Sequence, residues 1–270
     1  MGTTPRRRRV LVPSLQLQSA TPEQEVLLDK EFAHYLGRVL RLEPGEIIEI
    51  SDGSGFRWSA EITDISSNEV HVRLCENISN HQAHFPIYLA QALVKNDRFD
   101  LILRQCTEMG VHGILPFVSE RCVTRLDAKK AAKRLERWQK IVRESARQSE
   151  KDWIPEIFPL SSLDKLKTLE SIETLPHILC WEGESQYMLT DWTREHLSQT
   201  KDLRGVVIVV GPEGGFSASE VERLHHKGMR PTGLGSFILR TETAGISVLA
   251  VLQYLLGFFG GSEPPLCPPA

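Results

Sequence analysis

The sequence predicts an α/β protein with two domains, a small β-rich domain followed by a larger domain built on a mostly parallel sheet. The first observation is the length of 270 residues, which favours about two domains. The second is that short alternating strands with glycine-rich turns occupy residues 10–77. The third is that apolar strand segments alternate with helical segments from Pro86 onward, as in a parallel sheet covered on both faces.

In the first domain we expect strands at Glu46–Ile50, Trp58–Ile65 and Glu69–Leu74. The last two alternate apolar and polar residues, as half-buried strands do. Asp52–Gly55 separates the first two strands, because aspartate and glycine tolerate the backbone angles of tight turns. A short helical turn is expected at His34–Leu40, and the polar stretch Glu76–His84 is interpreted as a linker between the domains.

In the second domain we expect strands at Ile87–Val94, Gly113–Val118, His177–Cys180 and Val206–Val210. Asn96 is the expected cap of a helix that runs to about Met109. A further helix at Ser217–Lys227 opens with a Ser-x-x-Glu capping box. The apolar stretch Ala244–Phe259 is about one to two turns shorter than a membrane span, so we interpret it as a buried helix.

The net charge of −3 excludes a wholly basic nucleic-acid-binding protein, but the charge is unevenly distributed. Residues 81–150 carry 13 basic and 8 acidic side chains and form the only positive third of the chain. The centre of this block is a basic helix expected at Ala128–Lys151, with one apolar face. Two interpretations stay open for its basic side chains, a solvated face and a surface that faces the phosphates of a polyanion.

The five cysteines are scattered, odd in number and form no CxxC pair, so neither a disulfide framework nor a zinc site is expected. No metal is expected at any other site. The arginine-rich start of the chain lacks the apolar core of a signal peptide. These features indicate a cytoplasmic protein with reduced thiols and no membrane partner.

The sharpest motif joins the buried strand Val206–Val210 to a helix through Gly211–Phe216 (GPEGGF). Ligands bind at the carboxyl ends of parallel strands, and glycine lets a ligand approach the backbone. The nucleotide motifs GxGxxG and GxxxxGK[ST] do not fit, and the charge of Glu213 disfavours a phosphate. The turn is better suited to a ligand with positive or hydrogen-bond-donor groups, and a tight turn without a ligand is the alternative.

A second loop, Leu234–Ala244 (LGSFILRTETA), leads into the apolar C-terminal helix. It combines glycine with a cluster of arginine, threonine and glutamate. Arg240 and Glu242 are candidates for ligand contacts, and a salt-bridged helix start is the alternative interpretation.

Together these motifs resemble the RsmE family, the ribosomal RNA small-subunit methyltransferases of the SPOUT superfamily. The resemblance extends over nearly the whole chain, and its matching segments are Gln91–Gly110, Ser119–Arg121, Arg137–Ser149, Gly211–Phe216 and Leu234–Ala244. The N-terminal His34-x-x-x-Arg38-Val-Leu-Arg41 is similar to the RNA-binding, PUA-like domain of the family. Phe237 stands where the family usually has arginine, and Glu150-Lys151 where it has Gly-Arg, so these positions are not carried over as contacts.

The resemblance implies a PUA-like β-barrel RNA-binding domain at residues 1–77 and a SPOUT methyltransferase domain at 85–262, whose chain threads a trefoil knot. It implies S-adenosylmethionine as cofactor, held between three loops in the knot, with Leu234, Ile238 and Leu239 around the adenine. The cofactor-binding residues that it implies are Leu179, Gly211, Glu213, Gly214, Gly215, Leu234, Gly235, Ser236, Ile238, Leu239 and Arg240.

The family reaction is methylation of uridine N3 in 16S ribosomal RNA by a homodimer. Because neutral uridine N3 is a poor nucleophile, we expect Glu242 to act as general base and Arg240 to stabilise charge on the uracil oxygens, with Glu213 as the competing carboxylate. Uracil N3 lies on the pairing edge, so the target base must be unpaired or flipped out. The RNA contacts that we expect are Arg38, Arg41, Lys95, Arg98, Arg121, Lys133, Arg137 and Arg147.

Two other functions stay open at this point. One is ribose 2′-O-methylation of RNA by the same fold, and the other is a non-catalytic RNA-binding factor for ribosome assembly. A nucleotide-dependent oxidoreductase is disfavoured because GxGxxG is missing. The sequence leaves open whether free RNA or the assembled small subunit is the substrate.

Overall fold

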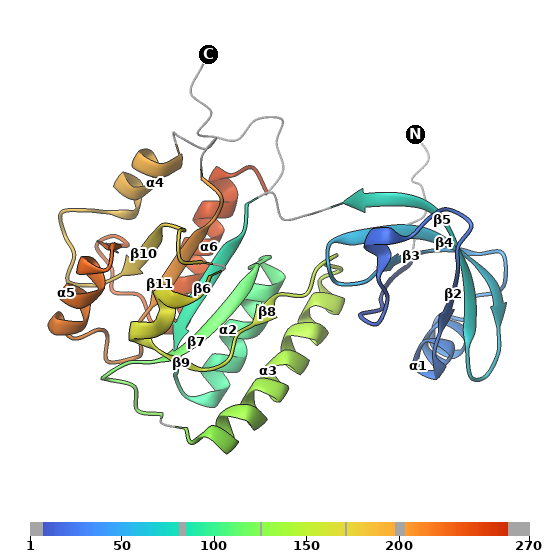
Figure 1. Ribbon diagram of the computed structural model, residues 1–270, viewed down its shortest axis with the longest axis horizontal. Coiled ribbons are helices and arrows are strands. Elements are labelled where there is room, and N and C mark those ends of the chain that lie inside the picture. The colour runs from blue at the N-terminus through green and yellow to red at the C-terminus, as the bar shows by residue number, and fades with distance from the viewer. Residues whose placement is uncertain (1–7, 81–84, 125, 171, 198–202, 259–270) are drawn as a thin grey trace, which may run out of the picture. The chain divides into compact units, whose positions relative to one another are not determined.

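The computed structural model describes residues 8–80, 85–124, 126–170, 172–197 and 203–258 (Figure 1). The contacts within the chain divide it into two compact units. The first holds residues 1–84 together with 146–154, and the second holds residues 85–145 and 155–270. The sequence pattern contained no signal that 146–154 groups with the N-terminal residues.

The first unit is built on a five-stranded sheet in the order β1-β3-β4-β5-β2. The strands are β1 (Arg8–Leu11), β2 (Glu25–Leu28), β3 (Ile47–Ser51), β4 (Phe56–Ile65) and β5 (Val70–Asn80). Strand β1 lies parallel to β3, and the other neighbours are antiparallel. The expected linker at Glu76–His84 was wrong in its first half, because β5 continues to Asn80, which pairs with Phe56. The backbone of β5 stays paired with β4 beyond Leu74, where the alternation of apolar and polar residues ends in the sequence.

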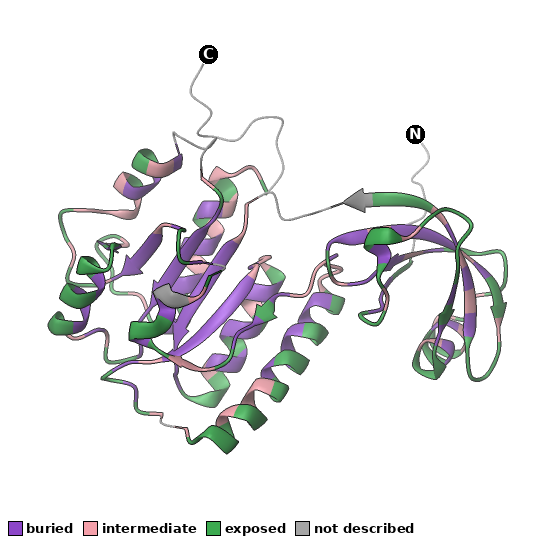
Figure 2. Ribbon diagram, in the orientation of Figure 1, coloured by how far each residue is buried: buried purple, intermediate pink, exposed green. Residues whose placement is uncertain are grey.

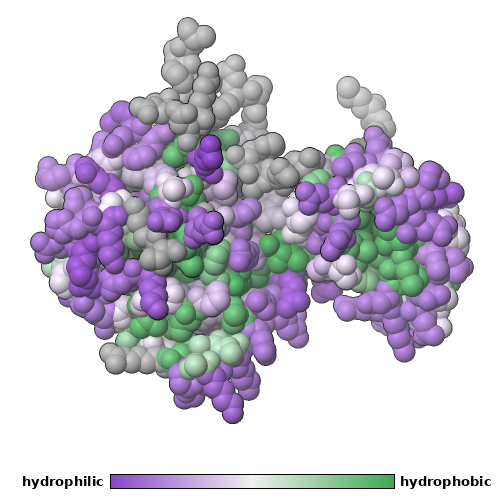
Figure 3. All heavy atoms as spheres, in the orientation of Figure 1, coloured by the Kyte–Doolittle hydropathy of each residue, from purple (hydrophilic) through white to green (hydrophobic). Residues whose placement is uncertain are grey.

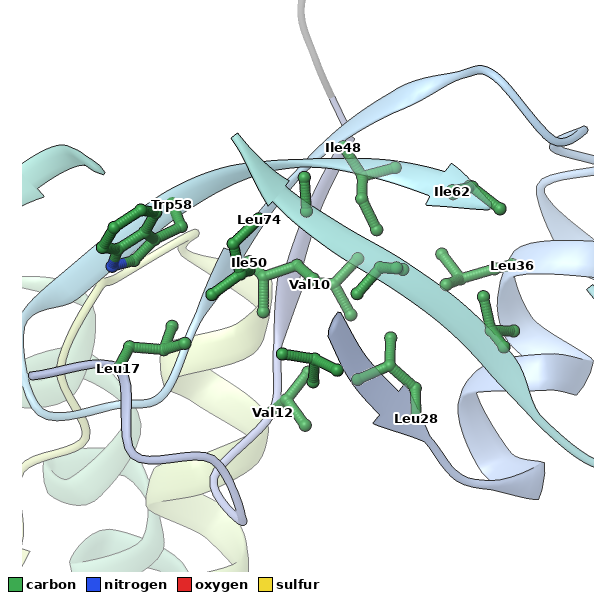
Figure 4. Packing of buried hydrophobic residues seen from close by; sticks show 14 of the residues in the cluster. Val10, Val12, Leu17, Leu28, Leu36, Ile48, Ile50, Trp58, Ile62 and Leu74 are labelled. Atoms are coloured by element: carbon green, nitrogen blue, oxygen red, sulfur yellow. The ribbon is translucent and has the colours of Figure 1, made fainter. Parts of the chain in front are cut away.

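Apolar residues from the strands, the helical turn and the 3-10 helix before β2 fill the core of this unit, as Figure 4 shows. Leu36, Ile48, Ile50 and Ile62 are fully buried there. The helical part is longer than the expected turn: α1 (Lys30–Ala33) continues as a π-helix at His34–Val39, η2, and the short 3-10 helix η1 spans Leu17–Ser19.

The second unit is a parallel sheet in the order β12-β10-β11-β6-β7-β8, with β9 also pairing with β7. The strands are β6 (Ile87–Ala92), β7 (Gly113–Val118), β8 (Glu156–Ile157), β9 (Ser161–Ser162), β10 (His177–Cys180), β11 (Val206–Val210) and β12 (Met229–Thr232). The four expected strands are therefore confirmed, with β6 ending at Ala92. Residues of β6, β10 and β11 are buried throughout, which explains their continuous apolar runs (Figure 2).

Five α-helices lie in the described part of the second unit, α3 with all but its last three residues: α2 (Asn96–Glu108), α3 (Ala128–Gln148), α4 (Leu189–Leu197), α5 (Ala218–His226) and α6 (Thr241–Leu255), with a 3-10 helix, η3, at Leu163–Thr168. The capping box of α5 is confirmed, with Glu220 as its acidic member. Asn96 as helix cap was wrong: Lys95 is extended and its carbonyl accepts from the amides of Arg98 and Phe99, so Asn96 is the first helical residue.

The last helix begins earlier than Ala244, at Thr241, because the polar residues of its first turn hid its start in the sequence. The chain leaves β11, passes through α5 to β12 on the far side of β10, and then returns as α6 to pack on α2 and β11 (Figure 1). Polar residues cover most of the visible surface of each unit, with apolar patches between them (Figure 3).

Candidate active site

A cavity of about 590 Å³ lies at the carboxyl ends of β10, β11 and β12. It is lined by Arg98 of α2 and by residues from the segments 180–184, 210–216 and 233–244. Because parallel strands end at the same edge of their sheet, the three segments that follow them meet there. The volume lies within the usual range of roughly 300–1,000 Å³ for small-molecule sites.

The turn after β11 is closely packed at two of its glycines. A Cβ atom on Gly211 would lie 3.1 Å from the ring of Phe216, and one on Gly215 would clash with the carboxylate of Glu182. Gly215 also has a φ of 66°, in the left-handed region. The Phe216 ring is buried and stacks on Phe117 at 6.4 Å. These glycines therefore fix the shape of the cavity wall.

Side chains from the loop after β7 support the same turn. Arg121 Nη1 donates to the Gly214 carbonyl at 2.9 Å. The amide of Glu120 donates to Glu220 Oε1 at 2.8 Å, and the hydroxyl of Ser217 donates to Glu120 Oε2 at 2.7 Å. Arg121, which was expected to contact RNA, thus donates a hydrogen bond that supports the glycine turn.

Thr241, the first residue of α6, connects three parts of the site. Its Oγ1 donates to the Gly211 carbonyl at 2.6 Å and accepts from Gln91 Nε2 of β6 at 3.0 Å. Gln91 is fully buried, and Thr241 is nearly so. We call this chain of hydrogen bonds the Thr241 latch; it ties the start of α6 to the glycine turn.

Arg98 lies between the two candidate carboxylates of the cavity. Its guanidinium is 3.4 Å from Glu213 Oε1 and 3.9 Å from Glu242 Oε1. The other oxygen of Glu242, Oε2, is buried and has no hydrogen-bond partner among the described residues. Glu242 thus has a cationic partner at one oxygen and no partner at the other among the described residues. The ion pair of Glu242 is with Arg98, which disfavours the salt-bridged start with Arg240.

The remaining lining is both acidic and apolar. Glu182 and Glu184 follow β10, whereas Leu234 and Leu239 are half-buried in the segment after β12. Cys180 also lines the cavity, and burial raises the pKa of its thiol to about 12. The thiol therefore stays protonated and is a poor nucleophile.

The structure brings most of the expected cofactor and catalytic residues to this one cavity. Those that line it are Gly211, Glu213, Gly214, Gly215, Leu234, Gly235, Ile238, Leu239, Arg240 and Glu242. Leu179 and Ser236 do not line it: Leu179 is fully buried inside β10, and Ser236 is exposed in the loop. Sequence reasoning missed Trp181, Glu182 and Glu184, although the predicted strand His177–Cys180 pointed to the loop that carries them.

The expected RNA contacts lie on several elements. Arg38 and Arg41 are exposed in the first unit, and Arg147 belongs to that unit through the segment 146–154. In the second unit, Lys95 and Lys133 are exposed. Arg98 lines the cavity, while Arg137 forms an ion pair with the buried carboxylate of Asp100.

The described part of the chain holds no cluster of three or more histidine, cysteine, aspartate or glutamate side chains arranged for a metal ion. In the same part, no helix has both the length and the apolar character to cross a membrane.

Two family models match the chain. The model described as an RNA methyltransferase domain matches residues 81–253, and the model described as an RNA methyltransferase PUA domain matches residues 28–75. The first match includes every segment that lines the cavity.

Relatives named ribosomal RNA small subunit methyltransferase E align over most of the chain. The protein of Synechocystis is 35% identical over 92% of this chain and 78% of its own length, and that of Bacillus subtilis is 32% identical over 86% and 91%.

Solved structures are also similar. A methyltransferase from Legionella pneumophila in complex with the cofactor SAM has a TM-score of 0.73 and 32% identity, covering 96% of this chain and all of its own. A ribosomal RNA small subunit methyltransferase E from Neisseria gonorrhoeae bound to S-adenosyl methionine has a TM-score of 0.73 and 28% identity, covering 92% of this chain and 97% of its own.

Proposed function

The chain belongs to the RNA methyltransferase family, among the ribosomal RNA small subunit methyltransferases E, and on this premise we propose that it uses S-adenosylmethionine to methylate N3 of a uridine in 16S ribosomal RNA. The observation that carries the proposal is the cavity where three strand ends meet, which contains a carboxylate oxygen, Glu242 Oε2, that is buried and unpaired among the described residues.

The residues of the cavity fit S-adenosylmethionine, which supplies an activated methyl group on a positively charged sulfur when bound. Leu234, Ile238 and Leu239 offer apolar surface for an adenine ring. The carboxylates of Glu182 and Glu184 favour a cation in the same space. Leu179 supports the cavity indirectly, because its buried side chain anchors β10, the strand that leads into the loop at 180–184.

For the uridine, Glu242 is the proposed general base. Its Oε2 accepts the N3 proton, which leaves N3 with the electron pair needed to attack a methyl group. Arg98 lies 3.9 Å from the other oxygen, Oε1, so Oε2 is the oxygen of Glu242 that has no partner among the described residues. Arg240 then stabilises the negative charge that develops on the uracil oxygens.

The direct test is methyl transfer to small ribosomal subunits taken from cells that lack this activity, and to free 16S RNA, followed by mass spectrometry of the nucleosides. We expect 3-methyluridine. A 2′-O-methylated nucleoside would establish the ribose reaction instead. Binding to the subunit without any methylated product would favour the assembly factor.

The roles of the two carboxylates are separated by Glu242→Gln and its matched control Glu213→Gln. General base catalysis contributes about 10²–10⁴-fold, so Glu242→Gln is expected to lower kcat in that range while calorimetry finds unchanged cofactor affinity. Near-normal turnover of Glu242→Gln would rule out Glu242 as the base, and selective loss in Glu213→Gln would assign the role to Glu213.

We further propose residues 1–77 as the PUA-like barrel that binds RNA and 85–262 as a knotted SPOUT domain, acting in the cytoplasm as a homodimer. The passage of the chain around β10 and back to α6 supports the knot.

Val251, Tyr254 and Phe258 on and just after α6 are exposed and support a dimer through this helix. Sedimentation of a Tyr254→Glu variant tests the dimer.

A further inference from the structure

Phe237 lies in the middle of the loop that connects β12 to α6. Its side chain is 83% exposed, and it lines the cavity. The loop is fixed at both ends, because Thr232 is fully buried in β12 and Thr241 is held by the latch. The ring is thus presented at the site on an anchored loop.

The other aromatic residues of the cavity are already packed. Phe216 is buried and stacked on Phe117. Trp181 is half-buried, and its indole packs over Gly183, where a Cβ atom would clash with the ring. Phe237 makes no ring contact within the described part of the chain, so both faces of its ring are available to a ligand.

The neighbours of Phe237 indicate what that ligand is. The same segment carries a cation, Arg240, and a carboxylate, Glu242, and all three side chains line the cavity. A uracil taken out of its stack offers a flat π-face, two oxygens and an N3 proton. An aromatic ring, a cation and a carboxylate match these three features.

We propose that Phe237 stacks on the flipped target uracil and holds its N3 toward Glu242. This inference rests on the proposed function, and it makes Phe237 a substrate-positioning residue. The adenine of the cofactor is the other flat group for this site, but the half-buried Leu234 and Leu239 already offer it an apolar surround. Phe237, with its large exposure, is accessible to a macromolecular substrate.

The test compares Phe237→Ala, Phe237→Leu and Phe237→Trp in steady-state methylation of small ribosomal subunits. Alanine removes the stack, leucine keeps apolar bulk without a flat ring, and tryptophan keeps the ring. Since base–aromatic stacking contributes about 1–3 kcal/mol per base, we expect kcat/KM for the subunit to fall about 5- to 150-fold in Phe237→Ala. Phe237→Leu is expected to fall similarly and Phe237→Trp to stay near wild type.

Cofactor affinity by calorimetry and oligomeric state by sedimentation are measured on each variant, and both are expected to be unchanged. Val123→Ala is the matched control, because Val123 is 81% exposed but does not line the cavity. Three results would each overturn the inference. They are an unchanged kcat/KM in Phe237→Ala, equal activity of the leucine and tryptophan variants, and a loss of activity that is accompanied by an equal loss of cofactor affinity or of the dimer. Absence of 3-methyluridine with the wild-type protein would instead refute the proposed function.

Discussion

Replacing Thr241 by valine removes the hydroxyl at the centre of the Thr241 latch and keeps the size and branching of the side chain. The buried Gly211 carbonyl then loses its donor, which sits at 2.6 Å in the wild type. Leaving a buried acceptor unpaired costs about 1–3 kcal/mol. The side-chain amide of Gln91 loses one acceptor but keeps another, the Ala92 carbonyl at 3.2 Å, so the lost hydrogen bond from Gln91 adds less to this cost. We therefore expect the free energy of unfolding to fall by about 1–3 kcal/mol.

Urea unfolding measures this change, and calorimetry measures the affinity for S-adenosylmethionine, which we expect to fall because the glycine turn is no longer tied to α6. Thr241→Ser is the matched control: it keeps the hydroxyl and loses one methyl group, worth about 0.8 kcal/mol. Serine is expected to preserve cofactor affinity.

The pair Gln91→Met and Thr241→Val completes a double-mutant cycle. Contacting residues in one hydrogen-bond network show coupling of about 0.5–3 kcal/mol. The reasoning is refuted if the two changes add without coupling, or if Thr241→Val binds the cofactor as well as Thr241→Ser does.

Three further predictions concern charge, pH and reactivity. Lys133→Ala is expected to reduce the slope of log binding constant against log salt for single-stranded RNA by about 0.7 without changing the free energy of unfolding. Arg137→Ala is expected to reduce the slope and also to lower the free energy of unfolding by about 1–3 kcal/mol, because the buried carboxylate of Asp100 loses this ion pair. A salt slope that Lys133→Ala leaves unchanged would return α3 to the solvated-face interpretation. Burial lowers the pKa of His112 in the folded protein, so the unfolded chain takes up a proton at this residue more readily than the folded one. The free energy of unfolding is therefore unaffected by His112 above its usual pKa of about 6.5 and decreases as the pH falls below that value. His112→Asn should flatten the decline of stability in urea unfolding between about pH 7 and 5, and an equal decline would contradict this. The pKa of about 12 for buried Cys180 predicts that iodoacetamide at neutral pH labels it far more slowly in the native protein than in urea, as mass spectrometry can measure; fast native labelling would show that the thiol is accessible.

The sequence was sufficient to predict the parallel sheet and the meeting of its two glycine loops. Buried strands such as Val206–Val210 are continuous apolar runs, and a parallel sheet brings their carboxyl ends together whatever the rest of the chain does. The capping box of α5 was equally local, because all its hydrogen bonds lie within four residues.

What could not be predicted depends on contacts between distant residues. Arg98 was expected on an RNA surface because it is basic and lies in the positive block, but the packing of α2 places it between Glu213 and Glu242. Similarly, nothing in the residues around Arg137 indicated its buried partner, Asp100. Side-chain partners across a fold follow from the packing of helices on the sheet, which periodicity does not specify.

The Thr241 latch joins residues that are 150 positions apart in the chain. A protein is synthesised from its N-terminus, so Gln91 leaves the ribosome long before Thr241 does. The walls of the cavity are therefore incomplete until α6, which carries Thr241, has emerged. A growing chain of this protein therefore has no finished site until Thr241 and the helix that it begins have left the ribosome.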